Sequence, residues 1–252
     1  MPGSRALVRL VGGASRRLER PELLAVVDGS AREAQREAIG IGAVLAATLG
    51  GSGTYVDVGT NRGQVLREAV RIAPAGAHIA FEPIPALAAE VAREFPAVDC
   101  REKALGARAE QTEFCHFRRR EGWSGLQRSP EISDDEGDPE YITVDVSTLD
   151  SELAAVSPSV VKIDVEGAEM AVLEGAREVL SRARPRVIFE HVYAAAALYG
   201  APQGGVWDIF DELAYDVFSI TGEGPFTREG FIAAAGIVNW LAAPRGDGAT
   251  RS

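Results

Sequence analysis

The stretch that decides the fold is Thr54-Tyr55-Val56-Asp57-Val58-Gly59-Thr60-Asn61-Arg62-Gly63. Its first five residues form a β-rich run, and the rest form a turn that contains glycine. Residues 64–72 then read as a helix, and residues 77–81 form a second short strand. Strand, helix and strand in such short steps are typical of βαβ units in a parallel sheet. Right-handed crossovers are therefore expected between these strands.

The same alternation continues along the chain. Further strands of the main alternation are expected at residues 98–100, 160–165, 186–190, 216–220 and 237–242, and further helices at 85–95, 168–182 and 206–213. The middle of the chain departs from this rhythm, with extra strands expected at 111–117 and 141–146 and a long surface loop at 118–140. A loop of that length is usually functional or mobile. The pattern predicts an α/β fold with a doubly wound, mostly parallel sheet.

The alternation begins only after residue 50. Residues 1–50 read as a helical N-terminal extension, with the clearest helix at 31–49 and a sharp stop at Gly50-Gly51-Ser52-Gly53. We expect this extension to belong to the same domain as residues 51–245, because no linker separates the two parts. It either covers a substrate pocket or caps the core.

Composition limits the classes of partner. The 252 residues carry a formal charge of −11, which would repel DNA or RNA unless a local basic patch outweighed it. A small-molecule substrate is therefore favoured over nucleic acid. No apolar run is long enough to span a membrane, and the N-terminus lacks the unbroken apolar core of a secretory signal. We expect a cytoplasmic protein, and the sequence does not indicate an oligomeric state.

The turn after the first strand has the residues of a cofactor site. Ligands of open α/β sheets bind at the carboxyl ends of the strands. Gly59 permits a tight turn, Asn61 tolerates positive φ, and Gly63 lets the next helix pack close to the strand. The amides at that helix start can receive a carboxylate, and Asp57 suits an ammonium group or a bound water better than a pyrophosphate.

Glu82 strengthens this interpretation. It ends the second strand about twenty residues after the glycine turn, where an acidic side chain accepts hydrogen bonds from ribose hydroxyls. The apolar run before it and Pro83 after it argue against an ordinary surface glutamate. Together the turn and Glu82 predict a cofactor that contains adenosine.

A third stretch, Val161-Lys162-Ile163-Asp164-Val165-Glu166-Gly167-Ala168-Glu169, is followed by Val172-Leu173-Glu174-Gly175-Ala176. With the two segments above, it resembles the hallmark of the FkbM family of S-adenosylmethionine (SAM)-dependent methyltransferases. The resemblance runs from about Tyr55 to Pro244. It implies a class I, Rossmann-like methyltransferase fold with a doubly wound, mostly parallel seven-stranded sheet.

The resemblance also implies an activity and a set of site residues. The family transfers a methyl group from SAM to oxygen, typically to a hydroxyl of a sugar, a polyketide or another secondary metabolite. The residues implied to hold SAM are Asp57, Gly59, Asn61 and Gly63 around the methionine part, Glu82 and Pro83 at the ribose, Ala104 and Leu105 beside the adenine, Ser124, and Asp164 near the methyl group.

Transfer to an alcohol is helped by a base near the hydroxyl proton. His191 titrates nearest to neutral pH and is the first candidate, with Asp164 and Glu166 as further catalytic residues. Alternatively, Asp164, Glu166 and Glu190 could bind Mg²⁺, which would acidify the hydroxyl. Residues two apart on a strand face opposite sides, so Asp164 and Glu166 share one site only if the strand ends before Glu166.

Three alternatives remain at this point. An NAD-dependent oxidoreductase would have a G-x-G-x-x-G turn, whereas residues 57–63 read D-x-G-x-N-x-G, and a Tyr-x-x-x-Lys pair is absent. A SAM-binding module without catalysis is argued against by the intact segment 164–169. A nucleic-acid methyltransferase that acts on amino groups would carry an Asn/Asp-Pro-Pro-aromatic turn at residues 164–167, where this chain has Asp-Val-Glu-Gly.

Overall fold

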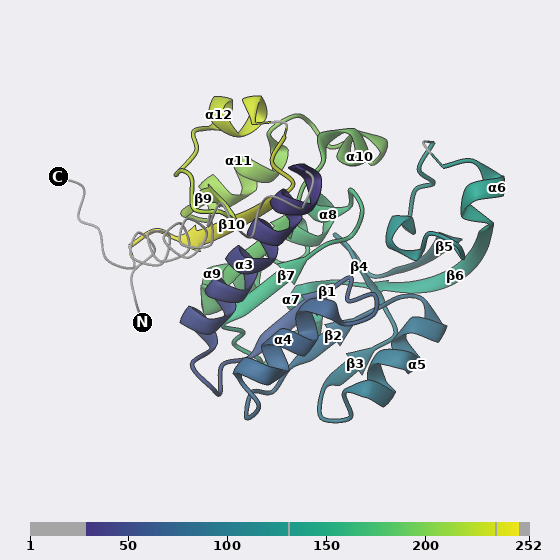
Figure 1. Cartoon of the computed structure of the whole chain (residues 1–252), viewed down its shortest axis with the longest axis horizontal. Coiled ribbons are helices and arrows are strands. Elements are labelled where there is room, and N and C mark those ends of the chain that lie inside the picture. The colour runs from purple at the N-terminus through teal and green to yellow at the C-terminus, as the bar shows by residue number, and fades with distance from the viewer. Residues whose placement is uncertain (1–28, 131, 235, 247–252) are drawn as a thin grey trace.

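The computed structural model describes residues 29–130, 132–234 and 236–246. Its centre is a seven-stranded sheet with the order β3-β2-β1-β7-β8-β10-β9, which confirms the predicted fold class (Figure 1). The strands are β1 (Tyr55–Val58), β2 (Ile79–Phe81), β3 (Asp99–Arg101), β7 (Val160–Ile163), β8 (Arg186–Glu190), β9 (Tyr215–Ser219) and β10 (Asn239–Pro244).

Strand direction changes at one edge of this sheet. β3, β2, β1, β7 and β8 pair in parallel, whereas β10 is antiparallel to both β8 and β9. β2 lies on one side of β1 and β7 on the other, so the order of the strands reverses at β1. Such a reversal of strand order is where open α/β sheets bind ligands, at the carboxyl ends of the strands.

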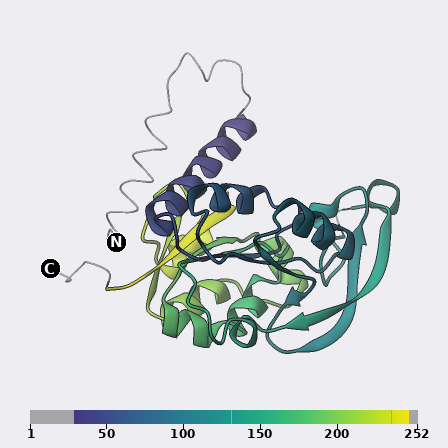
Figure 2. The same cartoon turned by 90° about the horizontal axis from the view of Figure 1, so that it is seen from below.

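Helices cover both faces of the sheet (Figure 2). One face packs against α3 (Gly29–Leu49), α4 (Gln64–Ile72) and α5 (Pro85–Glu94). The other packs against α7 (Leu149–Glu152), α8 (Glu169–Glu174), α9 (Arg177–Ala183), α11 (Gly205–Glu212) and α12 (Arg228–Ala233). Because side chains alternate along a strand, Tyr55 enters the first layer and its neighbour Val56 the second.

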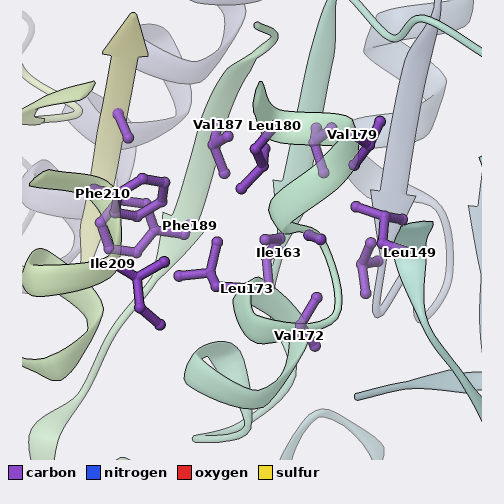
Figure 3. Packing of buried hydrophobic residues seen from close by; sticks show 14 of the residues in the cluster. Leu149, Ile163, Val172, Leu173, Val179, Leu180, Val187, Phe189, Ile209 and Phe210 are labelled. Carbon is purple, nitrogen blue, oxygen red and sulfur yellow. The ribbon is translucent and has the colours of Figure 1, made fainter. Parts of the chain in front are cut away.

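The second layer contains the larger apolar cluster. Figure 3 shows Phe189 of β8 beside Phe210 of α11, and their ring centroids lie 5.0 Å apart. Val172 and Leu173 of α8 lie below Ile163 of β7 in the same view. Burial of these side chains fixes α8 against the end of β7, and the loop between them carries part of the candidate site.

A second, three-stranded sheet stands beside the first (Figure 1). It has the order β4-β6-β5 and consists of β4 (Ala104–Leu105), β5 (Glu110–Phe117) and β6 (Pro139–Ser147). The strands expected at residues 111–117 and 141–146 are β5 and β6 of this sheet, and β4 is its third strand. The segment 118–140 between them is not wholly a loop, because it contains a 3-10 turn (Glu121–Trp123) and α6 (Asp134–Gly137), and β6 already begins at its end.

The prediction of one helix at residues 168–182 is wrong in one respect, because the structure has two helices there, α8 and α9. A Cβ at Gly175 would lie 2.1 Å from the carbonyl oxygen of Gly106, so the chain there packs against another backbone. The carboxylate of Asp150 then accepts hydrogen bonds from the amides of Glu178 (3.0 Å) and Val179 (2.7 Å), which caps the second helix.

Two further expectations concern the N-terminal extension and a membrane span. The helix expected at 31–49 is present as α3, whereas the rest of the extension, residues 1–28, lies outside the described residues. Within the described ranges, no helix combines the length and the apolar character that a membrane crossing needs.

Candidate functional site

The turn after β1 is fixed by backbone hydrogen bonds to β2. The amides of Gly59 and Thr60 both donate to the carbonyl oxygen of Phe81, each at 3.1 Å. Gly59 has a φ of 77°, and a Cβ there would lie 1.8 Å from the carbonyl oxygen of Asp164. Asn61 also adopts a positive φ, 48°, as its residue type allows. The turn therefore needs glycine at 59 both for conformation and for space.

Glu82 lies against this turn, as predicted. Its carboxylate accepts hydrogen bonds from the amides of Asn61 (2.8 Å) and Ile84 (3.0 Å), and the residue is 4% exposed. Burial raises the pKa of Glu82 to about 7, although the two amides oppose the shift. A carboxylate has about four acceptor positions, so two remain for a ligand.

A cavity opens above these residues at the carboxyl ends of β1, β2 and β7. It encloses about 730 Å³, including space open to solvent. The predicted residues that line it are Gly59, Asn61, Glu82, Pro83, Ala104, Leu105, Ser124, Asp164 and Glu166. The structure thus brings together side chains from five separate parts of the sequence.

Two predicted cofactor residues lie behind the cavity wall and do not line it. Asp57 is 1% exposed, and its Oδ2 accepts a hydrogen bond from the Thr60 hydroxyl at 2.6 Å. A Cβ at Gly63 would lie 2.8 Å from the ring of Phe95, so this glycine allows the start of α4 to pack against the residue after α5. Both residues therefore hold the turn in shape from behind.

Lys162 lies within the buried strand β7 and is a residue of the site that was not predicted from the sequence. Its Nζ lies 2.8 Å from Oδ2 of Asp164 and 4.0 Å from Oδ1 of Asp57. Burial would lower the pKa of Lys162, but the two carboxylates outweigh it and hold the pKa above its ordinary value. The signal was a lysine within an apolar strand, since buried lysines are rarely left unpaired.

The loop after β7 gathers three carboxylates. β7 ends at Ile163, and Glu166 (φ 54°) and Gly167 (φ 103°) turn the chain, which meets the condition for Asp164 and Glu166 to share a site. One carboxylate oxygen each of Asp164, Glu166 and Glu190 lies within 4.8 Å of the others. Burial raises the pKa of Glu166 to about 8 and that of Glu190 to about 7, and Asp164 adds to both shifts.

Glu169 holds this loop from below. Its Oε1 accepts hydrogen bonds from the amides of Gly167 (2.9 Å) and Val165 (3.4 Å), and the residue is 1% exposed. Glu169 also lies in the first turn of α8, where a carboxylate interacts favourably with the helix dipole. The structure adds a defined task, because these bonds fix the backbone that carries Glu166.

His191 faces a different direction from Glu190. Its ring stacks on Phe231 at 5.4 Å, and its Nδ1 lies 4.0 Å from Oε2 of Glu169. His191 lines neither of the two cavities that contain Glu166. The base role predicted for His191 is thus not favoured by its position, and it remains a prediction.

Glu121, Gly122, Ser124 and Leu126 form a roof over the cavity, whereas Trp123 between them does not line it. Arg62 joins this roof to the turn, because its guanidinium binds Glu121 at 2.6 Å and Glu90 at 2.9 Å. The hydroxyl of Ser124 accepts a hydrogen bond from the amide of Phe117 at 3.0 Å, so this predicted residue ties the roof to β5. Loop 118–140 thus contributes directly to the site.

The residues around the cavity fit a nucleoside ligand. Its walls include apolar side chains of Ile84, Leu87 and Phe114, which suit a base, next to the carboxylate of Glu82, which suits a ribose diol. Asp164 and Glu166 of this lining, together with Glu190 beside it, also have the oxygen ligands that Mg²⁺ prefers. Lys162, however, already neutralises one of them, Asp164.

Comparison with known proteins supplies independent information. A family model described as the methyltransferase FkbM domain matches residues 57–217. Among solved structures, the chain is similar to methyltransferase FkbM from Methylobacillus flagellatus, with 13% identity and a TM-score of 0.48, over 94% of this chain. The match spans only 58% of the length of that protein.

Two other solved structures are similar at comparable levels. A TehB-like SAM-dependent methyltransferase from Corynebacterium glutamicum is 11% identical, with a TM-score of 0.45 over 85% of this chain and 94% of the other. The precorrin-6y C5,15-methyltransferase from Geobacter metallireducens is 15% identical, with a TM-score of 0.41 over 73% and 72%. No curated protein matched.

These structural likenesses are too distant to support an argument about function. The fold assignment depends on the strand order, and the family assignment depends on the family model, which covers more than half of the sequence. With the seven-stranded sheet, the turn after β1 and the matched segment in agreement, the protein belongs to the methyltransferase FkbM domain family.

Proposed function

We propose that the protein is an O-methyltransferase that moves a methyl group from SAM to a hydroxyl of a small molecule. The observation that carries the proposal is the cavity that joins Gly59, Glu82 and Asp164 at the carboxyl ends of β1, β2 and β7. Its lining contains groups that suit each part of SAM. The apolar walls suit adenine, Glu82 suits the ribose diol, and the carboxylates suit the positively charged end.

SAM, when bound, supplies a methyl group activated by its sulfonium, which passes to the acceptor oxygen while sulfur keeps the electron pair of the broken bond. The protein residues orient the reaction and accept the proton. Asp164 and Glu166 line the end of the cavity opposite the apolar walls, where a developing positive charge is stabilised by carboxylates.

Glu166 is the residue we propose as the proton acceptor. It lines the cofactor cavity and also a second, neighbouring cavity, so it can reach an acceptor held beside the cofactor. The hydroxyl proton passes to its carboxylate as the new O–CH₃ bond forms. His191 does not share this position, although the sequence favoured it.

Binding and turnover can be tested separately. Isothermal titration with SAM, S-adenosylhomocysteine and NAD should give binding of the first two ligands only, and binding of NAD alone would overturn the proposal. Release of S-adenosylhomocysteine should then be measured with hydroxylated acceptors, with and without EDTA. Loss of activity with EDTA and recovery with Mg²⁺ would favour the metal role predicted for Asp164, Glu166 and Glu190.

A protein that binds SAM but never releases S-adenosylhomocysteine would favour the binding-module alternative. The cluster of Asp164, Glu166 and Glu190 beside the cofactor cavity argues for catalysis, since a module that only binds SAM would not need several half-buried carboxylates that repel one another. No described feature of the turn favours the NAD-dependent alternative.

A further inference from the structure

A second cavity lies beside the proposed cofactor site. It encloses about 820 Å³, including open space, between loop 118–140 on one side and the segment around α10 (Tyr193–Leu198) on the other. Loop 118–140 contributes Trp123, Gln127, Ser129 and Pro130 to its lining. Glu166 is the one lining residue common to both cavities, so the two meet at its side chain.

The walls of the second cavity are apolar and partly exposed. Trp123 is 42% exposed, Val192 39% and Leu198 40%, and all three line the cavity. Large apolar side chains gathered at one concave place usually mark a ligand or partner site. A tryptophan face in particular binds flat rings and the C–H faces of other apolar groups.

The floor of the cavity is acidic. Glu166 and Glu190 line it, and no lysine, arginine or histidine does so among the residues that the structure describes. Carboxylates accept hydrogen bonds from hydroxyls and repel phosphate, sulfate and carboxylate groups. Where Glu166 and Glu190 are ionised, an anionic acceptor would therefore bring negative charge against them, with no cation in the lining to compensate.

The geometry of the cavity is fixed from both sides. The amide of Gln127 donates a hydrogen bond to the hydroxyl of Tyr199 at 3.0 Å, which ties the loop to the end of α10. A Cβ at Gly167 would lie 2.6 Å from the backbone of Ala195, so α10 also packs directly on the turn that carries Glu166. The two walls and the floor are thus connected.

We propose that this second cavity receives the methyl acceptor, and that it selects an uncharged molecule with neighbouring hydroxyls at one end and an apolar ring or chain at the other. The inference rests on the proposed function, because it places the acceptor beside the same cofactor. The apolar part contacts Trp123, Val192 and Leu198. The two hydroxyls donate to Glu166 and Glu190, and the one at Glu166 lies nearest the cofactor cavity.

The test uses binding and not turnover. Neutral probes and their anionic counterparts are compared in the full chain saturated with S-adenosylhomocysteine, namely phenyl β-glucoside with its 6-phosphate and 4-tert-butylcatechol with its phosphate monoester. Binding is followed by saturation-transfer NMR and by quenching of tryptophan fluorescence. We expect at least one neutral probe to bind at millimolar concentration and its phosphate to bind at least tenfold more weakly.

Trp123→Ala should weaken binding of the neutral probe about tenfold, the loss expected for one aromatic contact. Trp123→Phe should keep most of the affinity. Tyr193→Ala is the matched control, since Tyr193 is 45% exposed but does not line the cavity. S-adenosylhomocysteine should bind all three variants as it binds the wild type, which also shows that they are folded.

The two proposals fail in different ways. If S-adenosylhomocysteine and SAM do not bind at all, the proposed function is wrong. If they bind but neither neutral probe does, if the phosphate esters bind as well as the neutral probes, or if Trp123→Ala has the same effect as Tyr193→Ala, the assignment of the acceptor cavity is overturned.

Discussion

Glu82→Gln should change the pH dependence of stability as well as cofactor binding. The carboxyl of Glu82 is buried against the turn, and its pKa rises from 4.5 to about 7 because of that burial. The folded protein thus holds this proton more tightly than the unfolded chain does. The sign follows directly: the free energy of unfolding falls as the pH rises from about 4.5 to 7, because the folded state must bury a charge.

The magnitude follows from the same pKa. A gap of about 2.5 pH units, at about 1.4 kcal/mol per unit, gives about 3.5 kcal/mol of stability lost on full ionisation. Glutamine has one acceptor oxygen for the two amides that bind Glu82, so the variant should lose about 1–3 kcal/mol at every pH. Glu82→Gln is therefore expected to be less stable than the wild type at pH 5 and at least as stable as the wild type at pH 8.

Urea unfolding at pH 5 and pH 8 measures the free energy of unfolding of the ligand-free variant and wild type. The difference in free energy of unfolding between variant and wild type should shift by about 2.5 kcal/mol in favour of the variant from pH 5 to pH 8. Glu174→Gln, at an exposed position of α8, should show no such shift. A difference that stays constant between pH 5 and pH 8 would refute the reasoning about burial.

The same variant separates stability from cofactor binding. At pH 8 a stable Glu82→Gln protein should bind SAM at least tenfold more weakly, because an amide cannot accept charge-assisted hydrogen bonds from two ribose hydroxyls. For the wild type, affinity should rise with pH up to about 8 as Glu82 ionises. Isothermal titration at both pH values tests this, and equal affinity of variant and wild type would remove Glu82 from the cofactor site.

Four further substitutions test other parts of the site. Gly59→Ala places a Cβ 1.8 Å from a carbonyl oxygen and forces a positive φ on alanine, so calorimetry should show SAM affinity at least tenfold lower; wild-type affinity would mean that the turn does not contact the cofactor. Lys162→Met removes the cation between buried Asp57 and half-buried Asp164 and should cost about 3–5 kcal/mol in urea unfolding, whereas a loss below about 1 kcal/mol would show that water solvates them. Glu166→Gln should lower kcat for release of S-adenosylhomocysteine by about 100-fold or more with SAM affinity kept, and His191→Asn should retain most of kcat; the reverse outcome would return the base role to His191.

The sequence could indicate residues that are close along the chain or at the ends of predicted strands. The turn at residues 57–63 and Glu82 follow adjacent strands, and parallel strands bring their carboxyl ends to one edge, so their meeting was predictable. The sequence did not show which of these residues line the cofactor cavity and which lie behind its wall. Asp57 and Gly63 support the turn from behind because strand alternation and the packing of Phe95 direct them there.

His191 illustrates the other limit. It follows Glu190 in the sequence, and alternation along the strand sends the two side chains in opposite directions. Only the packing of α8 and α12 decides that Glu190 faces the acceptor cavity while His191 contacts Phe231 and approaches Glu169. The residue type at position 191 could not reveal this.

The sequence by itself determined the order of strands and helices, the class of fold, the glycine turn and the acidic residue after β2, because these depend on local periodicity and on spacing within one βαβ unit. Only the tertiary structure decided that Lys162 lies between Asp57 and Asp164, that Glu166 and Glu190 come together, and that loop 118–140 forms a roof over one cavity and a wall of the next. Those relations join segments that are far apart along the chain, and packing of the two layers against the sheet brings them into contact.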